Sequence, residues 1–272
     1  MGTSVTLVSN GSAAWLVIGL QNTTGITGGF KNLAGSATGL SAVVTYTADE
    51  LTVSNPAGFY QTLKSVSITP SLAASGVNGL DTGTSAVSTW YSVWVIWNGG
   101  TIAGLLSTSA TSPTMPSGYT HKARVGWVRS DSTAGNKFPL SFVQIGRNVQ
   151  YKIASGSNLV ALPLMGSGTS GSPTTPSLTA IGTGGFVPST AAAIVGFMAP
   201  GSTTGSMAGI ISPNASYGGY TSNTNSPPVV MASGSGTTPS SVTFRFMLET
   251  ANIYWASTGI SYIYCFGWED NL

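Results

Sequence analysis

The sequence predicts an all-β protein with two antiparallel β-sandwich (jelly-roll-like) domains. Three observations lead to this prediction. Polar and apolar residues alternate with a period of two in several short segments, the pattern of half-buried strands. The 272 residues include 36 Gly and 14 Pro, which favours many turns and argues against a helical protein. Hydrophobic residues make up 42% of the chain, so a sizeable core is available and disorder is excluded.

Charge is scarce, and this narrows the function classes. Charged residues make up only 6% of the chain, against about 25% in ordinary globular proteins. A formal net charge of +2 indicates no broad nucleic-acid footprint. One Cys and one His exclude a disulfide framework and His-rich or Cys-based metal sites. No apolar run reaches about 18 residues and no basic N-terminal region precedes one, so we expect neither membrane insertion nor a secretory signal.

Residues 1–45 form the first predicted segment. They are rich in Gly, Ser and Thr, contain one apolar stretch at 13–18 and carry a single charge, Lys31. A segment so poor in charge is hard to keep soluble alone. We expect it to pack against a sister subunit or a larger assembly, with a mobile leader as the alternative.

Residues 46–152 form the first predicted sandwich domain. The aromatic and β-branched run Trp90–Trp97 predicts a strand buried on both faces, and Asn98-Gly99-Gly100 after it predicts a tight turn. The segment then returns as a strand over 101–107. Further strands are predicted by the alternation at 65–72, by 124–129 and by 138–145, with a loop over 113–118.

Residues 153–179 are predicted to be a Ser/Gly/Pro-rich linker, since Pro173 and Pro176 cannot join a strand ladder. The second sandwich domain follows over 180–272. Its strands are predicted at 191–198, where flanking prolines favour a strand over a short helix, at 242–248 and at 261–266.

Aromatic and basic residues supply the candidate ligand contacts. Trp90 and Trp94 share one face of their strand and offer rings on which sugars stack, although filling the core is the commoner use of Trp. Six of the nine basic residues fall within 122–152. They indicate a patch for an anionic glycan, or else ordinary solvated strand ends. Arg124 and Arg129 would face opposite sides of a regular strand. The candidate contacts are Trp90, Trp94, Lys122, Arg124, Arg129 and Lys137.

The His and acidic residues are the candidates for enzymatic or metal sites. His121 has no acid near it in sequence, which argues against a catalytic triad. The adjacent acids Asp49-Glu50 and Glu269-Asp270 would point to opposite faces of a strand, so neither pair can flank a glycosidic bond. We expect no catalytic residues and no cofactor. A structural calcium ion at the loop 81–84 or at 269–271 stays open.

Several segments resemble a β module of tailed-bacteriophage fibres and related virion appendages. The likeness is carried by Gly79–Thr84 followed by Ser88–Ile96, and it covers residues 45–152. It continues through further segments in the same order, 105–110, 116–120 with Lys122, Val125 and Gly126, and 144–147, with 47–51 upstream. The last part of the chain, from 248–255 through 267–272, is similar to the C-terminal ends of such proteins.

The resemblance implies a non-enzymatic, homotrimeric virion surface protein, made in the host bacterial cytoplasm. We expect a fibre or spike subunit that attaches to other virion proteins through residues 1–45 and contributes to binding a bacterial surface polysaccharide. A capsid decoration or adaptor protein with no receptor role is the main alternative. A further alternative is a glycan depolymerase with a site between subunits. Substitution of Asp81, Asp131 or Glu249 would locate that site.

Overall fold

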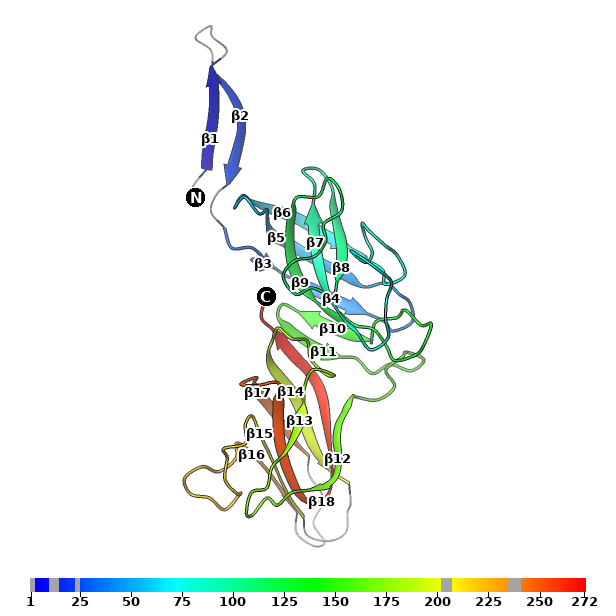
Figure 1. Cartoon of the computed structure of the whole chain (residues 1–272), viewed down its shortest axis with the longest axis vertical. Coiled ribbons are helices and arrows are strands. Elements are labelled where there is room, and N and C mark those ends of the chain that lie inside the picture. The colour runs from blue at the N-terminus through cyan, green and yellow to red at the C-terminus, as the bar shows by residue number, and fades with distance from the viewer. Residues whose placement is uncertain (1–2, 10–14, 23–24, 202–206, 234–240) are drawn as a thin grey trace. The chain divides into compact units, whose positions relative to one another are not determined.

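The computed structural model describes residues 3–9, 15–22, 25–201, 207–233 and 241–272 (Figure 1). Their regular elements are strands, without a helix among them, and the pairs between named strands are antiparallel. The prediction of an all-β, antiparallel protein is therefore confirmed. Residues 1–2, 10–14 and 23–24 of the predicted N-terminal segment lie outside the described residues. The same holds for residues 202–206 and 234–240 of the predicted second domain.

No helix in the described ranges is long and apolar enough to cross a membrane.

The chain divides into two compact units. The first contains residues 1–146, 156–158 and 272, and the second contains 147–155 and 159–271. The division falls close to the predicted end of the first domain at residue 152. It differs because residues 148–151 form a strand that pairs within the second unit.

The first unit contains a hairpin and two antiparallel strand sets. In the hairpin, β1 (Thr3–Ser9) pairs with β2 (Trp15–Asn22). In the first set, the centre is β5 (Thr45–Ser54), with β6 (Tyr60–Ile68) along one edge. The other edge of β5 carries β3 (Phe30–Lys31) and β4 (Ala34–Ala37), and β4 also pairs with β10 (Phe142–Ile145).

The second set has β7 (Trp90–Trp97) between β8 (Ile102–Ser107) and β9 (His121–Arg129). Strand β7 is buried on both faces, as its aromatic and β-branched composition predicts. The predicted turn after it is also confirmed, because the Asn98 side-chain oxygen accepts the backbone N–H groups of Gly100 and Thr101 at 3.0 and 2.7 Å. Between the two sets, strand pairing is limited to Ser54 with Lys122 among the described residues.

Tyr46 links the strands of the first unit. Its side chain is fully buried, and its hydroxyl donates to Gln144 Oε1 at 2.9 Å. A Cβ at Gly35 would lie 2.4 Å from the Tyr46 ring, and one at Gly126 would lie 2.3 Å from its hydroxyl oxygen. Both positions therefore need glycine, because any larger side chain would displace the tyrosine.

The N-terminal segment predicted over 1–45 is too long. Residues 30–31 and 34–37 are strands that pair with β5, so they belong to the first unit's sheet. The sequence of β4, Ala-Gly-Ser-Ala, carries no strand signal of its own. It becomes a strand because Gly35 lets Tyr46 pack closely against it.

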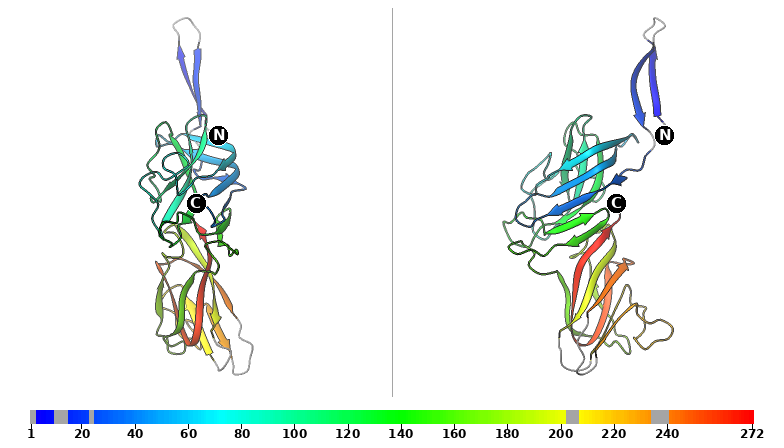
Figure 2. Two further views of the ribbon diagram at one scale, coloured as in Figure 1. Left: turned by 90° about the vertical axis from the view of Figure 1, so that its right-hand side faces the viewer. Right: turned by 180° about the vertical axis from the view of Figure 1, so that it is seen from behind.

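The second unit is organised along β18 (Asn252–Asp270), coloured red in Figure 2. One edge of β18 pairs in turn with β13 (Thr179–Gly182), β12 (Leu164–Ser170) and β11 (Asn148–Tyr151). The other edge pairs with β15 (Met207–Ser212) and β14 (Ala191–Pro200). Beyond these lie β16 (Val229–Ser233), paired with β15, and β17 (Val242–Met247), paired with β14. The predicted strands at 191–198, 242–248 and 261–266 are thus present.

The predicted linker over 153–179 is wrong for residues 164–170. These form β12, which pairs with β18 from Leu164 to Ser170 with two register shifts. Pro173 and Pro176 lie after this strand, so their missing N–H groups do not interrupt it. The glycines of β12 conceal the strand in the sequence because they carry no side chain to show an alternation.

Candidate functional site

The structure places five of the six candidate contacts on two neighbouring strands. Trp90 and Trp94 lie on β7, and Lys122, Arg124 and Arg129 lie on β9. The register pairs Trp94 with Arg124 and Trp90 with Arg129. Lys137 is on the half-buried loop that follows β9.

A register shift changes which face the arginines share. Trp90 and Trp94 are four residues apart on β7 and therefore face the same side. Their partners are Arg129 and Arg124, so both arginines also lie on that side. The expectation of opposite faces is wrong because β9 is not regular: Val93 pairs with Gly126 and Trp94 with Arg124, which leaves one extra residue on β9.

Trp94 is a core residue. Only 6% of it is exposed, and it packs in a cluster with Ile96 and Leu105 that Met115 and Tyr119 cover. Its indole N–H donates to Ser92 Oγ at 2.7 Å. The buried ring therefore offers no open platform for a sugar.

The cations of β9 lie over tryptophan rings. Lys122 Nζ is 5.2 Å from the centroid of Trp94, and it donates to the carbonyl oxygen of Thr111 at 3.3 Å. The Arg124 guanidinium carbon is 5.7 Å from the centroid of Trp127. Partial burial lowers the pKa of Lys122 from its usual value. These contacts hold both cations in defined places instead of leaving them in bulk solvent.

Lys122 and Arg124 line a cavity of about 320 Å³, which we call the basic pocket. Trp94 forms part of its wall, and hydroxyl groups come from Thr27, Ser54 and Thr111. Thr27 donates to Ser54 Oγ at 2.6 Å. Two cations among hydroxyls make a site suited to an anionic group. Trp90, Arg129 and Lys137 do not line this pocket.

Trp90 and Arg129 occupy the other end of the strand pair. Both side chains are half-buried. Arg129 Nε is buried without a hydrogen-bond partner among the described residues. This position suits neither side chain for stacking on or pairing with an extended ligand.

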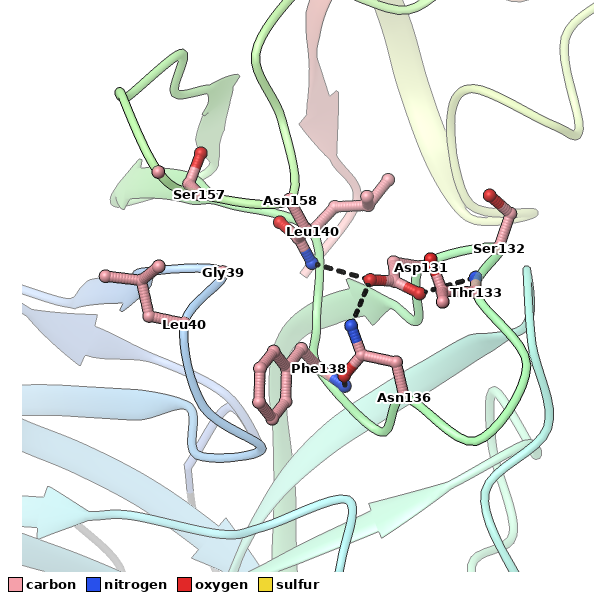
Figure 3. A pocket seen from close by; sticks show the side chains of 11 residues that line it. Gly39, Leu40, Asp131, Ser132, Thr133, Asn136, Phe138, Leu140, Ser157 and Asn158 are labelled. Atoms are coloured by element: carbon pink, nitrogen blue, oxygen red, sulfur yellow. Dashed lines mark hydrogen bonds between the residues drawn. The ribbon is translucent and has the colours of Figure 1, made fainter.

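A second cavity of about 370 Å³, the polar pocket, was not foreseen from the sequence. It is lined by residues 39–40, 131–133, 136, 138, 140 and 156–158 (Figure 3). Asp131 lines it and is 4% exposed. In the sequence, Asp131 is one of seven acidic residues, and no pattern shows that three loops far apart in the chain converge around it.

Hydrogen bonds hold the Asp131 carboxylate in place. Oδ1 accepts the backbone N–H of Thr133 at 2.7 Å, and Oδ2 accepts the side-chain amides of Asn136 at 2.6 Å and Asn158 at 3.4 Å (Figure 3). Asn158 also donates to the carbonyl oxygen of Pro139 at 2.9 Å. These bonds fix the carboxylate relative to the loops that form the pocket wall.

Four of the other carboxylates considered for catalysis or calcium are engaged by protein donors. Asp81 accepts the backbone N–H of Thr114 at 2.9 Å. Asp270 accepts the Thr190 hydroxyl at 2.6 Å, and Glu269 pairs with Arg245. Glu249 accepts the Asn214 amide at 2.6 Å. The described residues contain no group of three His, Cys, Asp or Glu side chains that could hold a metal.

Comparison of the chain with protein-family models, curated proteins and solved structures finds no match.

Proposed function

We propose that this chain is a non-enzymatic subunit of a surface fibre or spike of a bacteriophage or phage-like particle. In this proposal each compact unit is a jelly-roll-like β-sandwich and three copies assemble. The sequence resemblance over residues 45–152 supports the proposal, as does a strand-based architecture that needs no disulfide. A trimer would also cover sheet edges that a single copy exposes.

The hairpin of β1 and β2 carries the proposal. Its two strands pair with each other from Thr3 with Asn22 to Ser9 with Trp15. Among the described residues, its pairing with any other strand is limited to Asn22 with Tyr60. A two-stranded hairpin is marginally stable in water by itself. The first charged residue of the chain is Lys31, so the hairpin sequence is neutral. Such an element is suited to burial against another protein.

The hairpin therefore narrows the proposed attachment segment from residues 1–45 to residues 3–22. Residues 30–37 belong to the sheet of the first unit and cannot leave it without breaking pairs with β5. The attachment partner in this proposal is another virion protein.

The basic pocket supports a role in host attachment. Lys122 and Arg124 are positioned to contact an anionic group of a bacterial surface polysaccharide. A single such contact is weak, because exposed charge pairs contribute little. Several copies on one appendage would give useful avidity without a deep site.

A variant lacking residues 1–21 tests the attachment role, since it retains Asn22 and its pair with Tyr60. We expect it to keep its β-type circular dichroism and to be missing from gradient-purified particles by quantitative mass spectrometry. A full-length variant with both Lys122→Gln and Arg124→Gln is the matched control and should incorporate normally. Incorporation of the truncated chain at the normal level would contradict the proposal.

One observation favours the alternative of a decoration or adaptor protein without a receptor role. Trp94 is buried, so it supplies no sugar-stacking surface. Unchanged adsorption of particles that carry the Gln variant would favour this alternative.

A further inference from the structure

We propose that the polar pocket binds one neutral sugar residue. The inference rests on the proposed role in glycan attachment and names a second place on the first unit where a glycan would be held. It starts from Asp131, a buried carboxylate that faces a cavity of about 370 Å³ (Figure 3).

Hydrogen bonds tie the loops of the pocket to one another. The backbone N–H of Asn158 donates to the carbonyl oxygen of Gly39 at 3.3 Å, and its side chain joins Asp131 to Pro139. Within the loop after β9, Asp131 N–H donates to the carbonyl oxygen of Phe138 at 3.0 Å. A site fixed in this way loses little conformational freedom when a ligand binds.

The polar groups of the wall match a pair of neighbouring hydroxyls. A carboxylate offers about four acceptor positions. Protein donors occupy one on Asp131 Oδ1 and two on Oδ2, which leaves Oδ1 able to accept a ligand O–H. The hydrogen bonds of the described residues use Asn136 Nδ2 only toward Asp131, so its second N–H can donate to the adjacent ligand oxygen. A sugar hydroxyl both donates and accepts, as this arrangement requires.

Two apolar side chains complete the fit. Phe138 is half-buried and Leu40 is 57% exposed, and both line the pocket. The C–H face of a pyranose ring is apolar and packs well against such groups. A cavity of about 370 Å³ lies at the small end of the range of roughly 300–1,000 Å³ for small-molecule sites. It therefore suits one sugar residue.

The carboxylate also selects against acidic sugars. Asp131 is the charged residue among those that line the pocket, so a uronic acid would bring two negative charges together. The polar pocket and the basic pocket thus favour different chemical groups, the first neutral hydroxyls and the second an anion.

Saturation-transfer NMR on the full chain tests this inference, with glucose, galactose, rhamnose and N-acetylglucosamine as probes and glucuronate as the acidic counterpart. We expect at least one neutral sugar to bind with a Kd in the millimolar range. Asn136→Ala should weaken that binding roughly tenfold by removing a donor. Thr133→Trp should abolish it by filling the cavity, because the exposed side chain changes while the backbone bond to Asp131 stays.

Thr101→Trp is the matched control, since Thr101 is also exposed and lies on the turn after β7, outside the polar pocket. It should leave binding unchanged. The inference is overturned when none of the neutral sugars binds, when Thr133→Trp binds as well as the normal chain, or when glucuronate binds more tightly than glucose. Sugar binding by a chain that is missing from particles would refute the proposed function alone. A particle protein that binds none of the sugars would refute the inference alone.

Discussion

The ammonium of Lys122 lies 5.2 Å from the centre of the Trp94 ring. Trp94, expected from the sequence to stack on a ligand, instead forms a cation–π contact with this lysine. Trp94 is almost fully buried, and the cation covers it at the wall of the basic pocket. In the proposed attachment to glycan, this strand pair would therefore contribute charge at a fixed position and no stacking surface.

Reversing that charge should weaken binding to an acidic polysaccharide. For Lys122→Glu we expect roughly a tenfold loss of affinity for alginate at low salt, because attraction to an anion becomes repulsion. Surface plasmon resonance with immobilised full-length chain measures this. Lys137→Glu makes the same change of charge outside the basic pocket and should have a much smaller effect. Equal losses in the two variants would show that net charge, not the pocket, controls binding.

Loss of the hydrogen bond between Tyr46 and Gln144 should destabilise the folded protein. Tyr46→Phe removes the hydroxyl that donates to the buried Gln144 Oε1. We expect a loss of about 1–3 kcal/mol in the free energy of unfolding. Urea denaturation followed by fluorescence measures it. A change within roughly 0.5 kcal/mol, as found for neutral surface substitutions, would contradict this role.

Gly126 should tolerate no side chain. Gly126→Ala places a methyl group 2.3 Å from the Tyr46 hydroxyl oxygen, so the tyrosine must move. We expect a loss of about 1–3 kcal/mol in the free energy of unfolding. Gly100→Ala is the control, because its nearest neighbouring atom is 4.0 Å away. If both variants unfold at the same urea concentration, the close approach to Tyr46 carries no energetic cost.

The one histidine of the chain should titrate below its usual range. Burial lowers the pKa of His121 from 6.5, so between the folded and unfolded pKa values the unfolded chain binds more protons. Stability from this residue is complete above pH 6.5 and falls as the pH drops toward the folded pKa. A ¹H NMR titration of the imidazole C2 proton gives the pKa directly, and His121→Gln should remove this part of the pH dependence. A measured pKa at or above 6.5 would be inconsistent with the burial.

Cys265 should be unreactive in the folded protein. Burial raises the pKa of its thiol to about 12, so almost no thiolate is present at pH 8. We expect Ellman's reagent to leave the native chain unlabelled and to label one thiol per chain in guanidinium chloride. Rapid labelling of the native chain would show that this part of β18 opens readily.

The sequence predicts the long, strongly patterned strands well. Trp90–Trp97 and its turn are recognisable because β-branched and aromatic residues run without interruption into Asn98-Gly99-Gly100. Strands β4 and β12 escape prediction, since glycine and small residues carry no alternation and tertiary contacts decide their conformation.

The candidate sites are predicted only in part. Lys122 and Arg124 stand out as a basic cluster, and the structure brings both to one pocket. The shared face of Arg124 and Arg129 depends on an extra residue in β9 that pattern analysis does not detect. The polar pocket depends on three loops spread between residues 39 and 158, and loop convergence leaves no periodic signal.

Immunogold electron microscopy of purified particles, with an antibody against residues 180–272, tests the central proposal most directly. Label at the tail tip or on head spikes is the result predicted for a fibre or spike subunit. Label spread uniformly over the head would indicate a decoration protein instead. Absence of label on every particle, in preparations where the antibody detects the free chain, would contradict the assignment to a virion.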